Sequence, residues 1–475
     1  MMNRRKITGN GTALAAALLL TLSGCVGPVA ERTSAGYGAR VPTTADRQPV
    51  AQSSDEDRSA ERMTEETQGT GRTEAPSPAV ERTTEEAFLN GAANFSIGLL
   101  RQSVSAGENL LLSPYAALSV LSMTANGAAG ETRTQMEHVL ADGMPLDCLN
   151  RYMRGYRQAL SSSKTARLRT AGSIWFRDEA DRLQIEPSFL QVNTDFYDAG
   201  INKAPFHVQT VQEINRWVSE KTGGMIDRLV EELSPEDEMV LLSAIAFEAE
   251  WAKPYTDHQV SEGMFYTADG ASRTVDMLRA AERQYLDDGR AVGFLKSYAG
   301  GRYQFLALLP NEGISPAAYA ASLTGEDFRQ LVRGAEEATV HTALPAFDFT
   351  CDAMLEQPLR ALGMTDAFDE GAADFSRMGR SALGPLVIGS VRQKAFMQVS
   401  AQGTRAGAAA SVVMEPASVK PSEPEKIYTV TLDRPFLYGI VDGETGLPLF
   451  LGIMADPAKK TGAVGGRAAE VDSSL

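Results

Sequence analysis

The sequence predicts an α+β fold, because helical and strand-forming segments are segregated along the chain rather than alternating. Helical patterns dominate the first half, and short strand-like runs gather in the last third. Between two polar ends, residues 85–457 have mixed patterning and no internal repeat, a length that one large α+β domain can reach. A parallel doubly wound sheet would need regular alternation of strands and helices.

Two helices are predicted near the start of this domain. Glu85–Ser103 is amphipathic, since its apolar residues recur at helical spacing from Phe88 to Leu99. Tyr115–Asn126 is more apolar and predicts a buried helix. It follows Ser113–Pro114, and a serine before a proline suits a helix start.

Seven runs have the composition of β-strands. These runs are Gly172–Phe176, Met239–Phe247, Tyr303–Leu309, Leu386–Val391, Tyr428–Leu432, Phe436–Val441 and Leu449–Ile453. Five of the seven lie beyond residue 300, which is the segregation on which the fold class depends.

The N-terminus predicts export. Three cations at residues 4–6 precede the apolar stretch Ala13–Leu22, which is too short to span a bilayer. The run Leu22–Cys25 resembles the bacterial lipoprotein box, whose cysteine is lipidated and becomes the new N-terminus; the alternative is a chance cysteine after an apolar run. We predict a signal peptide over residues 1–24, lipidation of Cys25, and an exported protein anchored at the cell membrane or cell surface.

Charge and composition limit the partners. The formal net charge is −16 at pH 7 and becomes −19 once residues 4–6 are removed, so nucleic acid is not an expected partner. Residues 25–84 hold almost no large apolar side chain and predict a disordered tether with a reach on the order of 40 Å. Residues 458–475 predict a disordered tail.

No motif predicts an enzyme, a metal site or a cofactor. The histidines are far apart in sequence, and none begins a zinc-binding His-Glu-x-x-His helix. A nucleophile elbow and a P-loop are absent, and the Ser-x-x-Lys of Ser161–Lys164 suits a solvated loop. Cys148 and Cys351 could pair, but two buried, unpaired cysteines are expected.

The segment Gly403–Ser418 gives the most information about function. With a period of two, one face is small or apolar: Thr404, Ala406, Ala408, Ala410, Val412 and Met414. The other face holds both charges, Arg405 and Glu415. Alanine and glycine are poor strand formers, but they suit a segment that moves between a solvated loop and a tight slot. An ordinary alanine-rich loop or a short helix is the alternative.

From about Ala93 to Pro457 the chain resembles the serpins, a family of serine protease inhibitors. The similar segments occur in the family's order: Asn109–Pro114, Gly127–Thr132, Gln135–Met136, Ser173–Trp175, Ile214–Val218, Thr222–Ile226, Ser243–Phe247, Trp251, Pro254, Leu362–Met364, Ala367–Phe368, Ala373–Ser376, Asp433–Tyr438, Thr445–Gly446 and Leu449–Gly452. The resemblance implies three β-sheets, about eight to nine helices and an exposed reactive-centre loop.

The resemblance also implies the functional residues. The loop hinge would be Gly403, Thr404, Arg405, Ala406, Gly407, Ala408, Ala409 and Ala410, and the reactive bond would be Ala417–Ser418. The sheet-opening region would contain Trp251, Gln393 and Ser113. Three features depart from the family: Ala401 replaces an acidic residue, Gln393 replaces a frequent histidine, and the segment 418–435 is long.

The implied activity is suicide inhibition of a serine or a cysteine protease. The protease cuts the loop, the loop inserts into the central sheet, and the acyl-enzyme is trapped. A small Ala417 would suit a serine protease of elastase-like or subtilisin-like specificity, bound covalently by a monomeric inhibitor that needs no cofactor. The alternatives are a non-inhibitory serpin-fold binding protein and a secreted hydrolase with a spatially assembled site.

Overall fold

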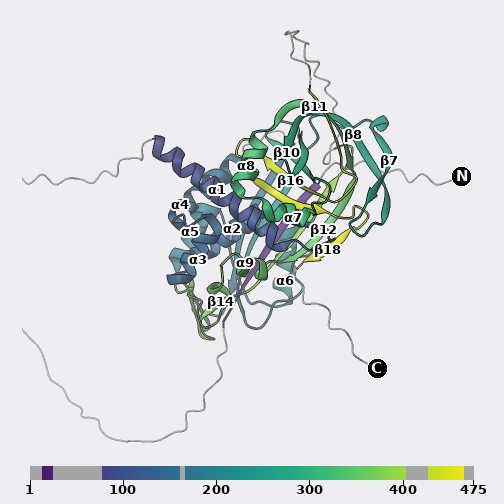
Figure 1. The fold of residues 1–475 in the computed structure, drawn as a ribbon. Coiled ribbons are helices and arrows are strands. Elements are labelled where there is room, and N and C mark those ends of the chain that lie inside the picture. Colours follow the sequence, from purple (N-terminus) through teal and green to yellow (C-terminus); the bar gives the residue numbers. More distant parts are fainter. Residues whose placement is uncertain (1–12, 25–77, 161–165, 403–425, 465–475) are drawn as a thin grey trace, which may run out of the picture.

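The computed structural model describes residues 13–24, 78–160, 166–402 and 426–464. These residues form three β-sheets and nine α-helices (Figure 1). The helices lie mostly in the first half and the strands mostly in the second. The predicted α+β class is therefore confirmed, as are the three sheets and the number of helices.

The central sheet has seven strands in the order β18-β12-β14-β1-β6-β3-β5. Their bounds are β18 Thr461–Val464, β12 Phe347–Met354, β14 Leu386–Val399, β1 Ala13–Gly24, β6 Asp237–Glu248, β3 Arg167–Arg177 and β5 Gly200–Ala204. The long strands β14, β1, β6 and β3 are antiparallel to their neighbours in this series, and they form the middle of the sheet.

A second sheet packs beside the first, in the order β15-β11-β8-β9-β10-β16-β17-β2, with β7 paired to β8. Its strands are β15 Ile427–Thr431, β11 Glu336–Pro345, β8 Ser272–Asp287, β9 Ala291–Ser297, β10 Tyr303–Pro310, β16 Phe436–Asp442, β17 Pro448–Met454, β2 Leu110–Leu112 and β7 Val260–Tyr266. A small third sheet pairs β4 Leu183–Ile185 with β13 Gly379–Ser381.

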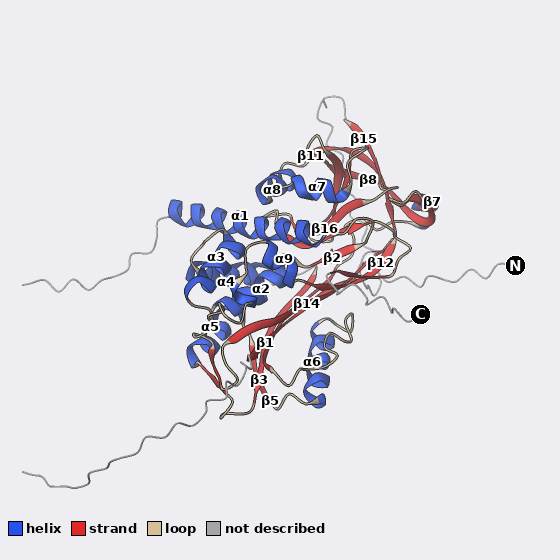
Figure 2. Ribbon diagram, turned by 60° about the horizontal axis from the view of Figure 1, so that its bottom comes forward, coloured by secondary structure: helices blue, strands red, loops and turns tan. Residues whose placement is uncertain are grey.

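Helices cover both faces of the central sheet (Figure 2). They are α1 Pro78–Ser103, α2 Pro114–Ala125, α3 Gly130–Ala141, α4 Leu146–Leu160, α5 Pro187–Tyr197, α6 Val208–Lys221, α7 Pro316–Ser322, α8 Gly325–Arg333 and α9 Glu356–Ala361. The α1–α5 group lies on one face and α6 lies alone on the other. The sheet is therefore covered on both sides, which explains why β6 is buried almost along its whole length.

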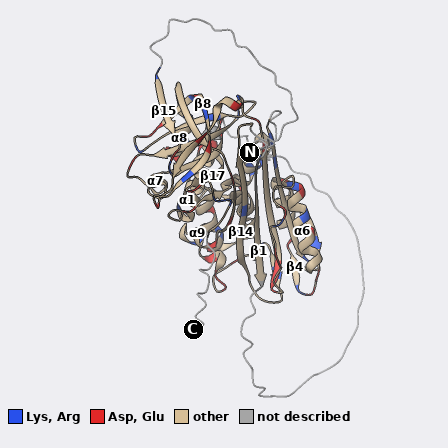
Figure 3. Ribbon diagram, turned by 90° about the vertical axis from the view of Figure 1, so that its right-hand side faces the viewer, with Lys and Arg blue, Asp and Glu red and all other residues tan. Residues whose placement is uncertain are grey.

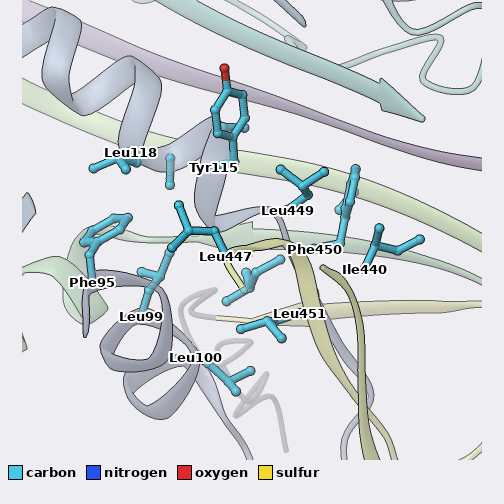
Figure 4. Close-up of a cluster of buried hydrophobic side chains, with 14 of the residues drawn as sticks. Phe95, Leu99, Leu100, Tyr115, Leu118, Ile440, Leu447, Leu449, Phe450 and Leu451 are labelled. Atoms are coloured by element: carbon cyan, nitrogen blue, oxygen red, sulfur yellow. The ribbon is translucent and has the colours of Figure 1, made fainter. Parts of the chain in front are cut away.

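Two hydrophobic cores follow from this arrangement. The larger core joins α1 and α2 to β16 and β17, where leucine and aromatic side chains interdigitate (Figure 4). The smaller core lies between α6 and the central sheet, and it includes Ile214 and Val218 of α6. The two cores lie on opposite faces of the sheet. Successive residues of one strand therefore enter different cores.

Both predicted helices and all seven predicted strands are present. Two predicted boundaries differ from the structure. Helix α1 begins at Pro78, inside the stretch assigned to the tether, and β18 lies inside the predicted tail. β18 is a short edge strand that pairs in parallel with β12, so backbone pairing rather than an apolar pattern determines its place.

The apolar N-terminal stretch forms β1, between β14 and β6, and Figure 3 shows β1 and β14 side by side. Leu18, Leu20 and Leu22 enter the larger core, whereas Ala17 and Leu19 enter the core under α6. The whole strand carries no charge, which suits a place with both faces covered. Removal of residues 1–24 as a signal peptide stays a prediction, and it would remove this strand.

No helix in the described part of the chain is long and apolar enough to cross a membrane.

We predict that the chain beginning at Cys25 unfolds at a lower temperature than the full chain. Removing β1 takes away the hydrogen-bond partner of both β14 and β6, together with leucines that are fully buried. Calorimetry of the two proteins measures the difference. A synthetic peptide of residues 13–24, added to the shorter chain, should restore part of the lost stability. Equal melting temperatures without peptide would contradict the prediction.

Candidate functional site

Gln393 links the middle of β14 to the start of α2. Its Oε1 accepts from the Ser113 backbone N–H at 2.9 Å, and its Nε2 donates to the Ser113 carbonyl at 3.0 Å. Both residues are fully buried. A carboxamide supplies the donor and the acceptor together and does not titrate, so this link is independent of pH. Gln393 stands where the serpin resemblance implies a frequent histidine, and with glutamine there both the N–H and the C=O of Ser113 have hydrogen-bond partners.

Ser113 also anchors α2 to the second sheet. Its hydroxyl donates to the Leu449 carbonyl at 2.8 Å and accepts from the Ala116 backbone N–H at 3.3 Å, as an N-cap residue does. Leu449 belongs to β17, so one serine joins a helix start to a strand of the other sheet. Together with Gln393, it connects the central sheet, α2 and β17 at one buried point.

Trp251 holds the end of β14. Its indole Nε1 donates to the Ser400 carbonyl at 2.9 Å, and the Tyr255 backbone N–H donates to the Ala401 carbonyl at 2.8 Å. The Trp251 ring is 1% exposed and stacks on Tyr298, with 4.4 Å between ring centroids. Because Ala401 is held through its backbone, the loss of an acidic side chain at this position leaves this contact intact.

The position between β14 and β6 accepts an extra strand. β1 fills it in antiparallel register with both neighbours, and Leu18 lies directly opposite Gln393 on one side and Ser243 on the other. Strand β14 ends at Val399, beside the start of β1; the described chain continues to Gln402 and resumes at Lys426 before β15. A segment that turned back at the end of β14 would therefore lie beside the position between β14 and β6 where a strand can pair.

Comparison with known proteins identifies the fold. A family model described as "Serpin (serine protease inhibitor)" matches residues 90–457. Serpin B8 of Bos taurus is 31% identical over 384 residues, which cover 78% of this chain and all of the relative. The crystal structure of the thermophilic serpin tengpin in the native state is similar with a TM-score of 0.71 and 39% identity, over 78% of this chain and 94% of tengpin. The chain belongs to the serpin family.

Tengpin in the latent state is also similar, with a TM-score of 0.66 and 34% identity over 78% of this chain and 98% of that one. The serpin resemblance stated from the sequence is thus confirmed for the family and the fold. Family membership supports protease inhibition as the general function. It is also consistent with a protein that acts without catalytic turnover.

Several predicted site residues of this serpin lie outside the described residues. They are Cys25, the hinge residues Gly403–Ala410 and the reactive bond Ala417–Ser418. The other three, Trp251, Gln393 and Ser113, lie along β14 and at its end, in two separate groups of contacts. Their role in sheet opening stays a prediction. The structure places all three on or beside β14, the strand that precedes residue 403.

The remaining candidates show no sign of chemistry. Cys148 and Cys351 are both free, as expected, although Cys148 is only half-buried. Burial raises the pKa of the Cys351 thiol to about 11, which keeps it protonated and unreactive near neutral pH. Within the described residues, no group of three or more histidine, cysteine, aspartate or glutamate side chains could hold a metal ion.

Sequence reasoning missed two residues of this serpin's site, Tyr255 and Lys296. Tyr255 follows a proline in a segment without regular periodicity, so its backbone contact had no sequence signal. Lys296 did have one, because it is a lone cation in the apolar run Ala291–Ser297, which forms β9. A cation in a strand of that composition must be paired or must lie at an edge.

We predict that Gln393→Leu lowers the free energy of unfolding by about 1–3 kcal/mol, because the buried N–H of Ser113 loses its partner and the Ser113 carbonyl keeps only its bond from the Ala117 N–H. Urea denaturation measures the change. Gln398→Leu is the matched control, since Gln398 is a half-buried residue on the same strand. Equal effects of the two substitutions would mean that the Ser113 contacts contribute nothing specific.

Proposed function

We propose that this serpin is an exported, lipid-anchored suicide inhibitor of serine proteases. Cleavage of the segment that follows β14 would let its hinge insert between β14 and β6 before the acyl-enzyme is hydrolysed. The displaced protease would then lose the alignment of its catalytic groups, for which small displacements already cost large rate factors. Each inhibitor molecule would act once.

The place filled by β1 carries this proposal. It lies next to the root of the segment and accepts an antiparallel strand. Its face toward the larger core is apolar, whereas on the other face the half-buried Arg392 and Lys394 of β14 lie opposite Leu19 and Ala17. On β14 the inner residues Met397 and Val399 are at most 1% exposed, whereas Phe396 and Gln398 are half-buried. The segment Thr404–Met414 has one face of small or apolar residues and carries its single charge, Arg405, on the other face, so it is suited to such a place.

β1 and the hinge would compete for one position, so the active inhibitor would be the chain that begins at Cys25. Removal of residues 1–24 would then serve two purposes, export and the opening of the insertion site. Inhibition should accordingly be assayed with the processed chain. The support for processing is the run Leu22–Cys25, with its small residues before the cysteine.

The target would be a protease with a shallow specificity pocket. Ala417 is small and uncharged, which suits an enzyme of elastase-like or subtilisin-like specificity and not one with a deep acidic pocket. The attacking group would be the protease's serine, or a cysteine in a related enzyme, and the product would be a covalent complex with the Ala417 carbonyl. A panel of purified proteases, scored for complexes that survive denaturation, tests the proposal directly.

We predict that Thr404→Arg converts the inhibitor into a substrate. An inward-facing cation would enter the buried side of the sheet unpaired, so insertion would slow while the loop stays cleavable. Arg405→Glu is the control, because in an inserted strand the residue after Thr404 would face the other side of the sheet, where β14 is half-buried. The measurement is the number of inhibitor molecules consumed per protease trapped, which should rise steeply for Thr404→Arg alone.

Equal behaviour of these two variants would contradict insertion with alternating burial. Cleavage of the unmodified protein without any trapped protease would favour the non-inhibitory binding protein instead. In that case a calorimetric scan before and after cleavage shows whether the cut segment still inserts, since insertion adds a paired strand and raises the melting temperature.

We predict that Cys25→Ser abolishes membrane attachment. Stable attachment here would depend on acyl chains at Cys25 and not on a spanning helix. The variant should be recovered as an unprocessed or soluble protein after membrane fractionation. Ser23→Ala is a suitable control, because it keeps a small residue in the box and leaves the thiol in place. Unchanged fractionation of Cys25→Ser would refute the anchor.

A further inference from the structure

A buried lysine lies behind the end of β14. Lys296, on β9, is 2% exposed, and its Nζ lies 2.7 Å from the Glu282 Oε1 of β8. The ammonium also donates to the Lys253 carbonyl at 3.2 Å. It lies over two aromatic rings, 4.3 Å from the Tyr255 centroid and 5.2 Å from the Trp251 centroid. One cation is therefore shared by a carboxylate, a carbonyl and two ring faces.

Burial of this charge is not explained by stability alone. Desolvation lowers the pKa of Lys296 even though Glu282 opposes the shift, so the fold holds the ammonium at a net disadvantage. An apolar side chain of similar volume would fill the same space in β9 without this penalty. What a lysine provides here and an apolar residue does not is a set of contacts that need a cation, namely those to the two ring faces and to Glu282.

The two rings under the cation belong to the residues that hold the root of the 403–425 segment. Trp251 donates to the Ser400 carbonyl through its indole, and Tyr255 donates to the Ala401 carbonyl through its backbone. Tyr298, two residues after Lys296 in the sequence, stacks on the Trp251 ring. Loss of the ammonium would remove one contact from each ring, and we expect the two residues to hold the Ser400 and Ala401 carbonyls less firmly.

We propose that Lys296 is a positioning residue for loop insertion, which fixes Trp251 and Tyr255 so that they hold Ser400 and Ala401. The proposal rests on the inhibitory function proposed above, although the contacts themselves can be tested without it. Lys296 does not meet the protease. It sets how firmly the last residues of β14 are held before the segment beyond them enters the sheet.

The first measurement is amide hydrogen exchange of the full chain at Tyr255, whose N–H binds the Ala401 carbonyl. Lys296→Met should raise its exchange rate by about tenfold or more, as local opening increases. Lys296→Met/Glu282→Gln should do the same without leaving an unpaired buried carboxylate, so the proposal can be tested even if the single variant folds poorly. Lys296→Arg, which keeps a cation over the rings, should restore protection.

Arg302→Met is the matched control. Arg302 is also a largely buried cation, paired with Asp442 at 3.1 Å and placed over the Tyr303 ring at 5.8 Å, but it does not contact Trp251 or Tyr255. It should leave exchange at Tyr255 within about twofold of the unmodified protein. Tyr255 exchange that rises equally in both variants, or that stays unchanged in the double variant, would overturn the proposal.

A second measurement separates this proposal from the inhibitory function. In a variant with Trp175→Phe and Trp217→Phe, the fluorescence of Trp251 alone should change with Lys296→Met and should not change with Arg302→Met. In the processed chain, Lys296→Met should alter the inhibitor consumed per protease trapped, while Trp251→Leu should remove most of that effect. No trapping by any variant would refute the inhibitory function; trapping that Lys296→Met leaves unchanged would refute the role of Lys296.

Discussion

The backbone groups that face one another across β14 and β6 need hydrogen-bond partners, and this requirement organises the central sheet. These are two of the longest strands of the sheet, and β1 supplies their partners along nearly its whole length. Helices cover both faces at this point, so a strand in this position must be uncharged on the side of the larger core if no buried charge is to be left unpaired there. The chain contains two segments that meet this condition in large part, Ala13–Gly24 and the hinge after β14.

β14 is held differently at its middle and at its end. In the middle, the Gln393 carboxamide forms two hydrogen bonds to Ser113, which is itself tied to β17, so three elements share one neutral contact. At the end, Ser400 and Ala401 are held through their carbonyls by residues of the segment after β6. Backbone carbonyl contacts do not depend on the side chain, so Ala401 can stand where relatives carry an acid.

A buried ion pair lies behind the end of β14. Lys296 and Glu282 bring an ion pair beneath an aromatic cluster, whereas the Gln393 contact is neutral. An ion pair in such surroundings is held by geometry and is easily unbalanced when one partner is removed. The Gln393 contact and the Lys296–Glu282 pair therefore differ in how they respond to substitution, although the first holds the middle of β14 and the second lies behind the residues that hold its end.

The sequence by itself determined the α+β class, the positions of two helices and seven strands, and the family, because these depend on local periodicity and on motifs within short windows. It also singled out Gln393, Trp251 and Ser113. Only the tertiary structure decided that an apolar N-terminal run pairs with β14 and β6, because strand pairing joins residues more than 200 positions apart and leaves no local pattern. The same reason hid the place of β18 and the aromatic surroundings of Lys296, which are assembled from segments distant in sequence.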